Sequence, residues 1–134
     1  MNGKWASRIG LAVFFTAGGI THFTSDRDFA SIVPPALPYP LQIVWATGVM
    51  ELLFAAALLQ NRYLPQIGFL LSLYLLAVLP ANIYMAVAGI SIFMEHVPTW
   101  AAWARIPLQF PLIALILWAT EAWPLRRAFE FSRA

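Results

Sequence analysis

The chain alternates between long apolar stretches and short polar connections, a pattern typical of membrane proteins. Four apolar stretches cover roughly residues 9–23, 41–60, 64–88 and 101–123. The helices expected on them have about 20 residues or more, enough for an α-helix to cross a hydrocarbon core of about 30 Å. We therefore expect one transmembrane domain over residues 1–134, of the all-α class. It should be an integral membrane four-helix bundle, with transmembrane helices at about 5–23, 41–60, 64–88 and 101–123.

The connections between the stretches predict how the helices are arranged. The outer loop at 24–40 contains four prolines, which exclude a regular helix across it. It is also rich in apolar residues, so we expect it to cover the mouth of the bundle as a lid. The turn at Asn61–Arg62 is short enough to make the second and third helices antiparallel neighbours. Pro80 should kink the third helix.

Composition supports a membrane location. The chain is 61% hydrophobic and 10% charged, whereas a soluble domain has about 45–50% apolar and about 25% charged residues. Its mean hydropathy is +0.74. The absence of cysteine excludes a structural disulfide, a CxxC redox centre and a thiolate metal site.

The distribution of positive charge predicts the orientation. Six of the eight basic residues fall on the side of the membrane that holds both termini and the middle turn: Lys4, Arg8, Arg62, Arg126, Arg127 and Arg133. The positive-inside rule then places the N and C termini in the cytoplasm. These charges lie at helix ends instead of forming a basic stripe on a soluble face, so we expect no nucleic-acid partner.

Five polar residues inside the apolar stretches need an explanation, because a charge at the centre of a bilayer costs about 2.5–3.5 kcal/mol. The rise of an α-helix places four of them in the outer half of the bundle and Glu51 near the midplane. Arg105 and Glu51 have opposite charges and would form a pair if their helices were adjacent. We expect these residues to form a ligand-binding site: His22, Glu51, Asn82, Arg105 and Gln109, with Tyr74 and Tyr84 as weaker candidates.

Each candidate also has a structural interpretation. His22 can cap a helix, and Asn82 can bind carbonyl groups freed by Pro80. Gln109 can join two helices, and Arg105 can extend to the outer headgroups. Haem ligation would need the second histidine, His96, which falls in a loop. Too few ligands converge for a metal, so we predict no metal site.

The polar residues lie within segments that resemble a known family. In chain order these segments are GGITHF at 18–23, IVPPALP at 32–38, GVMEL at 48–52, LPANIYMA at 79–86 and RIPLQ at 105–109. Together they resemble the DoxX family of small bacterial four-helix integral membrane proteins, over about residues 8–118. A single motif such as G-x-x-E is weak, whereas the ordered set is specific.

The resemblance implies location and fold more directly than chemistry. It implies a multi-pass protein of the bacterial inner (plasma) membrane. One family member is a subunit of an archaeal thiosulfate:quinone oxidoreductase, and distant animal relatives act as assembly chaperones or cargo receptors. The matching positions are again His22, Glu51, Asn82, Arg105 and Gln109. Because this chain has no cysteine, it departs from relatives thought to handle thiols.

Three functions follow as hypotheses. The first is an accessory subunit of a membrane redox system that binds a quinone or a similar lipophilic small molecule, with no covalent cofactor. The second is a non-enzymatic membrane assembly or interaction protein, and the third is a small-molecule carrier. The expected partners are the lipid bilayer, a lipophilic ligand, redox proteins and other copies of the chain or subunits of a complex. The sequence leaves open whether the protein is an enzyme.

Overall fold

The computed structural model describes residues 2–90 and 98–129. All regular secondary structure in this part of the chain is α-helix. Glu95, His96 and the last five residues of the basic tail lie outside the described residues. The helices are α1 (Gly3–Thr24), α2 (Asp26–Ala30), α3 (Pro40–Leu59), α4 (Leu64–Ala88), α5 (Thr99–Ala119) and α6 (Arg126–Phe129).

Two local features differ from the expectation. The loop at 24–40 contains the short helix α2, which forms because its five residues precede the first proline, Pro34. Helix α5 ends at Ala119 instead of residue 123. There the Thr120 hydroxyl donates a hydrogen bond to the Ile116 carbonyl over 2.7 Å. Glu121 then adopts a left-handed conformation with φ 58°, which a right-handed helix cannot continue through.

In the described part of the chain, three helices are long and apolar enough to cross a membrane: α3, α4 and α5. Only 17–33% of each apolar segment is buried inside the protein. Large apolar side chains therefore point outward, among them Leu53 at 65% exposure and Val87 at 67%. A surface of this kind requires an apolar surrounding, so the chain is a membrane protein. Helix α1 has 22 residues but a lower hydropathy, because it includes Arg8 and His22.

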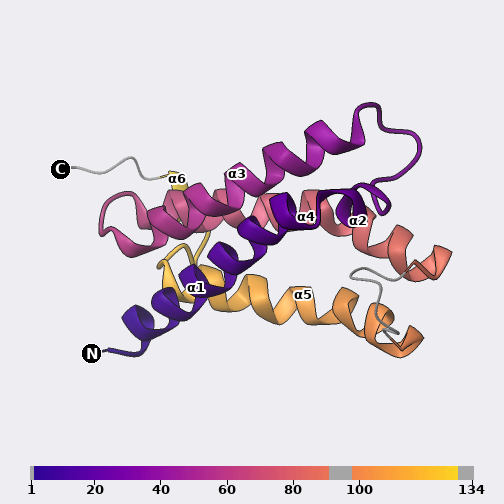
Figure 1. Ribbon diagram of the computed structural model, residues 1–134. Helices are drawn as coiled ribbons and strands as arrows, with labels where there is room; N and C mark the ends of the chain where they lie inside the picture. The colour runs from indigo at the N-terminus through magenta and orange to yellow at the C-terminus, as the bar shows by residue number, and fades with distance from the viewer. Residues whose placement is uncertain (1, 91–97, 130–134) are drawn as a thin grey trace.

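The four long helices pack in a closed order. Helix α1 packs most extensively on α3, and α4 packs on α5; α3 also touches α4, and α1 touches α5. Within the described chain, no Cα atom of α3 lies within 8 Å of one in α5, and the same holds for α1 and α4, so each of these pairs meets only through side chains in the core. The start of α1, the α3–α4 turn and α6 lie at one end of the molecule, and α2 lies toward the other end (Figure 1). We call the first of these the turn end and the second the α2 end.

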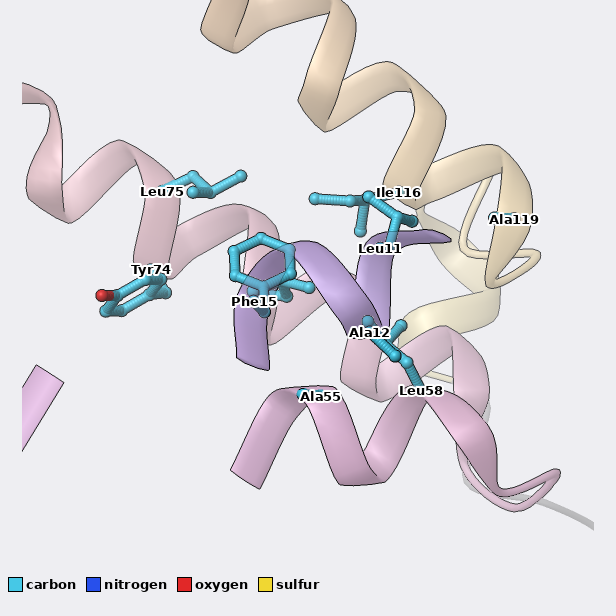
Figure 2. Close-up of a cluster of buried hydrophobic side chains, with 10 residues drawn as sticks. Leu11, Ala12, Phe15, Ala55, Leu58, Tyr74, Leu75, Ile116 and Ala119 are labelled. Carbon is cyan, nitrogen blue, oxygen red and sulfur yellow. The ribbon is translucent and has the colours of Figure 1, made fainter. Parts of the chain in front are cut away.

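The main hydrophobic core lies toward the turn end and joins all four long helices. Figure 2 shows side chains of α1, α3, α4 and α5 meeting around Phe15, which is 2% exposed. A second, smaller core lies toward the α2 end and consists of Ile32, Met85, Ala86 and Ala102. The polar candidate residues are distributed around these two cores.

Glycines allow the closest helix contacts. A Cβ atom on Gly48 of α3 would lie 2.7 Å from the His22 Cβ atom of α1, and a Cβ atom on Gly19 would lie 3.0 Å from the Gly48 carbonyl oxygen. Gly68 of α4 faces Thr120, just beyond α5, in the same way. Because small residues let helix backbones approach closely, these positions fix where α1 crosses α3 and where α4 meets the end of α5.

Candidate functional site: a His22–Glu51–Tyr74 cluster

Glu51 lies where α1 crosses α3 and is the acidic centre of the candidate site. Its carboxylate sits against Gly18, where an added Cβ atom would lie 2.5 Å from Glu51 Oε2. Glu51 Oε1 accepts a hydrogen bond from the Tyr74 hydroxyl of α4 over 2.7 Å. It also lies 3.8 Å from His22 Nε2 of α1. Three helices therefore each contribute one ionisable or hydroxyl side chain to this cluster.

The hydrogen bond of His22 determines its tautomer. His22 Nδ1 lies 2.7 Å from the Gly18 carbonyl oxygen, one helical turn earlier on α1. A carbonyl can only accept, so Nδ1 carries the hydrogen. In the neutral ring, Nε2 then presents a lone pair toward Glu51. Both side chains are 12% exposed, so the pair is largely removed from the surface of the protein.

Tyr74 connects this cluster to the main core. Its ring belongs to the core, and Figure 2 shows its hydroxyl oxygen directed away from the other core side chains. The ring also packs beside Phe54 of α3, with 5.9 Å between ring centroids. The hydrogen bond to Glu51 therefore comes from a residue held in a well-packed position. From the sequence, Tyr74 is only a weaker candidate, because a tyrosine in an apolar stretch often serves only in packing.

Helix α2 covers one face of the His22 ring. The Phe29 ring stacks on the imidazole with 4.3 Å between centroids and 20° between the ring planes. Trp45 Nε1 of α3 donates to Asp26 Oδ2 over 3.0 Å, which fastens α2 to α3. Within the connection expected to act as a lid, an aromatic ring thus lies directly on a candidate ligand-binding side chain.

Asn82 and Gln109 form a second polar group between α4 and α5. Asn82 Nδ2 donates to Gln109 Oε1 over 3.2 Å, and Gln109 Nε2 donates to the Leu75 carbonyl. Gln109 is 6% exposed. These two side chains are hydrogen-bonded to each other and to a backbone carbonyl near Pro80. Such contacts hold two helices together, and we call this pair the Asn82–Gln109 lock.

Arg105 does not form the expected pair with Glu51. No ion pair joins it to Glu51 among residues 2–90 and 98–129, and no Cα atom of its helix, α5, lies within 8 Å of a Cα atom of α3. Arg105 Nη1 instead lies 3.8 Å from the Met85 sulfur, and the residue is exposed. The five candidates are thus divided by their contacts: His22 with Glu51, Asn82 with Gln109, and Arg105 beside Met85.

From the sequence, Arg8 is only a charge that sets orientation, but the structure gives it a packing role. Arg8 is 7% exposed. Its guanidinium donates to the carbonyls of Leu58 and Gln60 over 3.4 and 3.1 Å, and to Asn61 Oδ1 over 3.1 Å. It therefore caps the C-terminus of α3, where carbonyls have no partner within the helix. The available signal was an arginine one turn inside the first helix.

Comparisons with known proteins identify the chain's family but not a function. No curated protein and no solved structure matches the chain. One family model matches residues 11–122, which include every residue of the two polar groups. The chain therefore belongs to the family described as a domain of unknown function, DUF8561.

Proposed function

We propose that the protein is a DoxX-like four-helix membrane protein in which α1 spans the bilayer together with α3, α4 and α5. The closed packing order supports this arrangement, since α1 lies between α3 and α5. Lys4, Arg8, Arg62, Arg126 and Arg127 all belong to the turn end. By the positive-inside rule, this end and both termini face the cytoplasm of a bacterial inner membrane.

We further propose that the His22–Glu51–Tyr74 cluster binds the polar head of a quinone or a similar lipophilic molecule. The observation that carries this proposal is the convergence of three hydrogen-bonding side chains from three helices in an apolar surrounding. Ligand sites typically combine an apolar lining with a few convergent polar groups. An intramembrane histidine–carboxylate pair is also the kind of group that marks proton and substrate pathways.

The spacing of the pair suits an oxygen atom of a ligand. The 3.8 Å between His22 Nε2 and Glu51 Oε1 is too long for a direct hydrogen bond. Both atoms are acceptors here, so a ligand hydroxyl beside the pair can make one hydrogen bond of about 2.8 Å, to one of the two atoms. A quinol hydroxyl placed there would donate its hydrogen to one of them. The electrons of any redox step would pass to a partner protein, for which this chain would be an accessory subunit.

The first test replaces Glu51 with glutamine in protein held in lipid nanodiscs. Glu51→Gln keeps the size of the side chain and an acceptor for Tyr74 but removes the negative charge. Because a hydrogen bond to a charged group is worth about 1.5–3 kcal/mol, affinity for a short-chain benzoquinol should fall about tenfold or more. Quenching of tryptophan fluorescence during titration measures the affinity.

A matched pair of tyrosine variants controls for general effects. Tyr74→Phe should also weaken binding, because it removes the hydroxyl that holds Glu51 Oε1. Tyr84→Phe is the same change ten residues later on α4 and should leave affinity unchanged. Failure of the wild-type protein to bind the probe, or equal affinities for all variants, would contradict a ligand site at this cluster.

The Asn82–Gln109 lock favours the second candidate function, a non-enzymatic membrane assembly or interaction protein. In that case the polar residues serve to hold the helices together, and the exposed apolar side chains meet a partner in the membrane. Gln109→Leu would leave Asn82 and the Leu75 carbonyl without this partner. The free energy of unfolding should then fall by about 1 kcal/mol, as for interhelical hydrogen bonds in membranes.

Reversible unfolding in mixed micelles measures this loss, and a double-mutant cycle with Asn82→Leu isolates the coupling between the two amides. An unchanged unfolding curve would show that the hydrogen bonds of the two amides do not stabilise the contact between α4 and α5. Three results together would replace the quinone proposal with the interaction function. They are a measurable coupling between the two amides, no binding of the benzoquinol, and co-purification of one membrane protein in fixed stoichiometry.

A further inference from the structure

A cavity of about 290 Å³ opens at the turn end, far along α3 and α4 from the His22–Glu51 pair. It lies between the α3–α4 turn, the first turn of α4 and the segment that carries Glu121 and α6. Its lining combines apolar Leu64 and Pro65 with polar side chains that include Asn61, Tyr63 and Arg127. A volume near 300 Å³ is at the lower end of the range for small-molecule sites.

The polar side chains of the lining present hydrogen-bond donors to the cavity. The Asn61 amide oxygen is already engaged by Arg8 over 3.1 Å, which leaves the amide NH₂ group as the donor. The Tyr63 oxygen accepts from Arg62 Nη2 over 3.2 Å, which leaves its own hydrogen to donate. Arg127 adds a guanidinium, which has donors and no acceptor.

The charge of the cavity is also suited to an anion. The one carboxylate among the described residues of the lining, Glu121, lies 3.3 Å from Lys4 Nζ, so that negative charge is paired. Arg127 is therefore left as the charge that a ligand would meet, with Arg62 beside Tyr63 as a second one. The positive end of the α4 helix dipole, at the N-terminus of α4, also favours an anion in this cavity.

The backbone of the lining is held in an uncommon conformation. Tyr63 and Glu121 have φ values of 56° and 58°, in the left-handed region that residues other than glycine rarely adopt. Helix α6 is also fixed in place, because Phe129 packs edge-on against Phe69 of α4 with 5.0 Å between centroids. The backbone segments that carry the donors are therefore held in place.

We propose that this cavity binds a phosphate group, carried by the headgroup of an anionic membrane lipid. Guanidinium, amide and phenol donors around a positive centre are the groups that recognise phosphate oxygens. The position at the turn end suits a lipid, because basic residues next to membrane helices mark the level of the headgroups. This inference depends on the membrane location of the chain and not on the quinone proposal.

The test uses the full chain in dodecyl maltoside, a detergent without phosphate. Short-chain phosphatidylglycerol is titrated into the protein and bound lipid is measured by native mass spectrometry. Arg127→Gln should lower the affinity about tenfold, and Tyr63→Phe, which does not change charge, should lower it severalfold. Arg126→Gln removes the same charge from the neighbouring position, which does not line the cavity, and should change the affinity less than twofold.

Equal losses for Arg126→Gln and Arg127→Gln would overturn the proposal, because they would show a diffuse attraction to net charge. Binding of phosphatidylcholine with the affinity of phosphatidylglycerol would also overturn it. Inorganic phosphate, tested as a second probe, distinguishes the two sources of the group. If it binds as tightly as the lipid and with the same dependence on Arg127, the phosphate site is supported and its ligand is a soluble phosphate.

Discussion

Replacing Gly68 with alanine is expected to lower the free energy of unfolding by about 3 kcal/mol, since an overpacked contact of this kind typically costs 1–3 kcal/mol or somewhat more. An added Cβ atom would lie 2.7 Å from the Thr120 Cβ atom and closer still to its hydroxyl. Thr120 is fully buried, and its hydroxyl is held by the Ile116 carbonyl, so it cannot move aside. Helix α4 must therefore separate from the end of α5. Reversible unfolding in mixed micelles measures the loss.

Gly10→Ala is the matched control, because it is the same substitution within α1 at a site where an added Cβ atom meets nothing within 4 Å. It should leave stability unchanged or raise it by up to about 1 kcal/mol, the helix propensity difference between glycine and alanine. Combining Gly68→Ala with Thr120→Gly should recover part of the loss. Equal stabilities for Gly68→Ala and Gly10→Ala would mean that α4 and α5 do not meet at this point.

Replacing Arg8 with alanine should lower the free energy of unfolding by about 1.5–3 kcal/mol, the range for hydrogen bonds to a charged group. The carbonyls of Leu58 and Gln60 at the end of α3 would lose their cap. Asn61, which also lines the cavity at the turn end, would lose the bond that orients its amide. Unfolding in mixed micelles again provides the measurement.

Lys4→Ala removes the same charge from the same helix and so controls for effects on membrane orientation. Lys4 is exposed and bonded to the exposed Glu121, so its loss should cost less than about 1 kcal/mol. Arg8→Lys should be intermediate, because one ammonium group cannot reproduce the fork of donors that reaches three acceptors. Equal effects of the Lys4 and Arg8 substitutions would show that Arg8 only sets the orientation in the membrane and does not stabilise the end of α3.

The sequence determined the properties that each segment has by itself. Hydropathy and proline positions located the long helices, and three of them are apolar enough to span a membrane. The cost of a polar group in lipid singled out His22, Glu51 and Gln109, all of which the structure gives interhelical contacts. These are local properties, since hydropathy, helix termination and desolvation depend on a residue and its near neighbours along the chain.

Only the tertiary structure decided which of these residues meet. Opposite charges suggested a pair between Glu51 and Arg105, but α3 and α5 are not adjacent in the packing order. Glu51 instead accepts a hydrogen bond from Tyr74 and lies beside His22. The same order brought Arg8 to the end of α3 across 50 residues of sequence. Partner choice depends on which helices are neighbours and how each is rotated about its axis. The close contacts at Gly48 and Gly68 set that rotation, and no single segment encodes it.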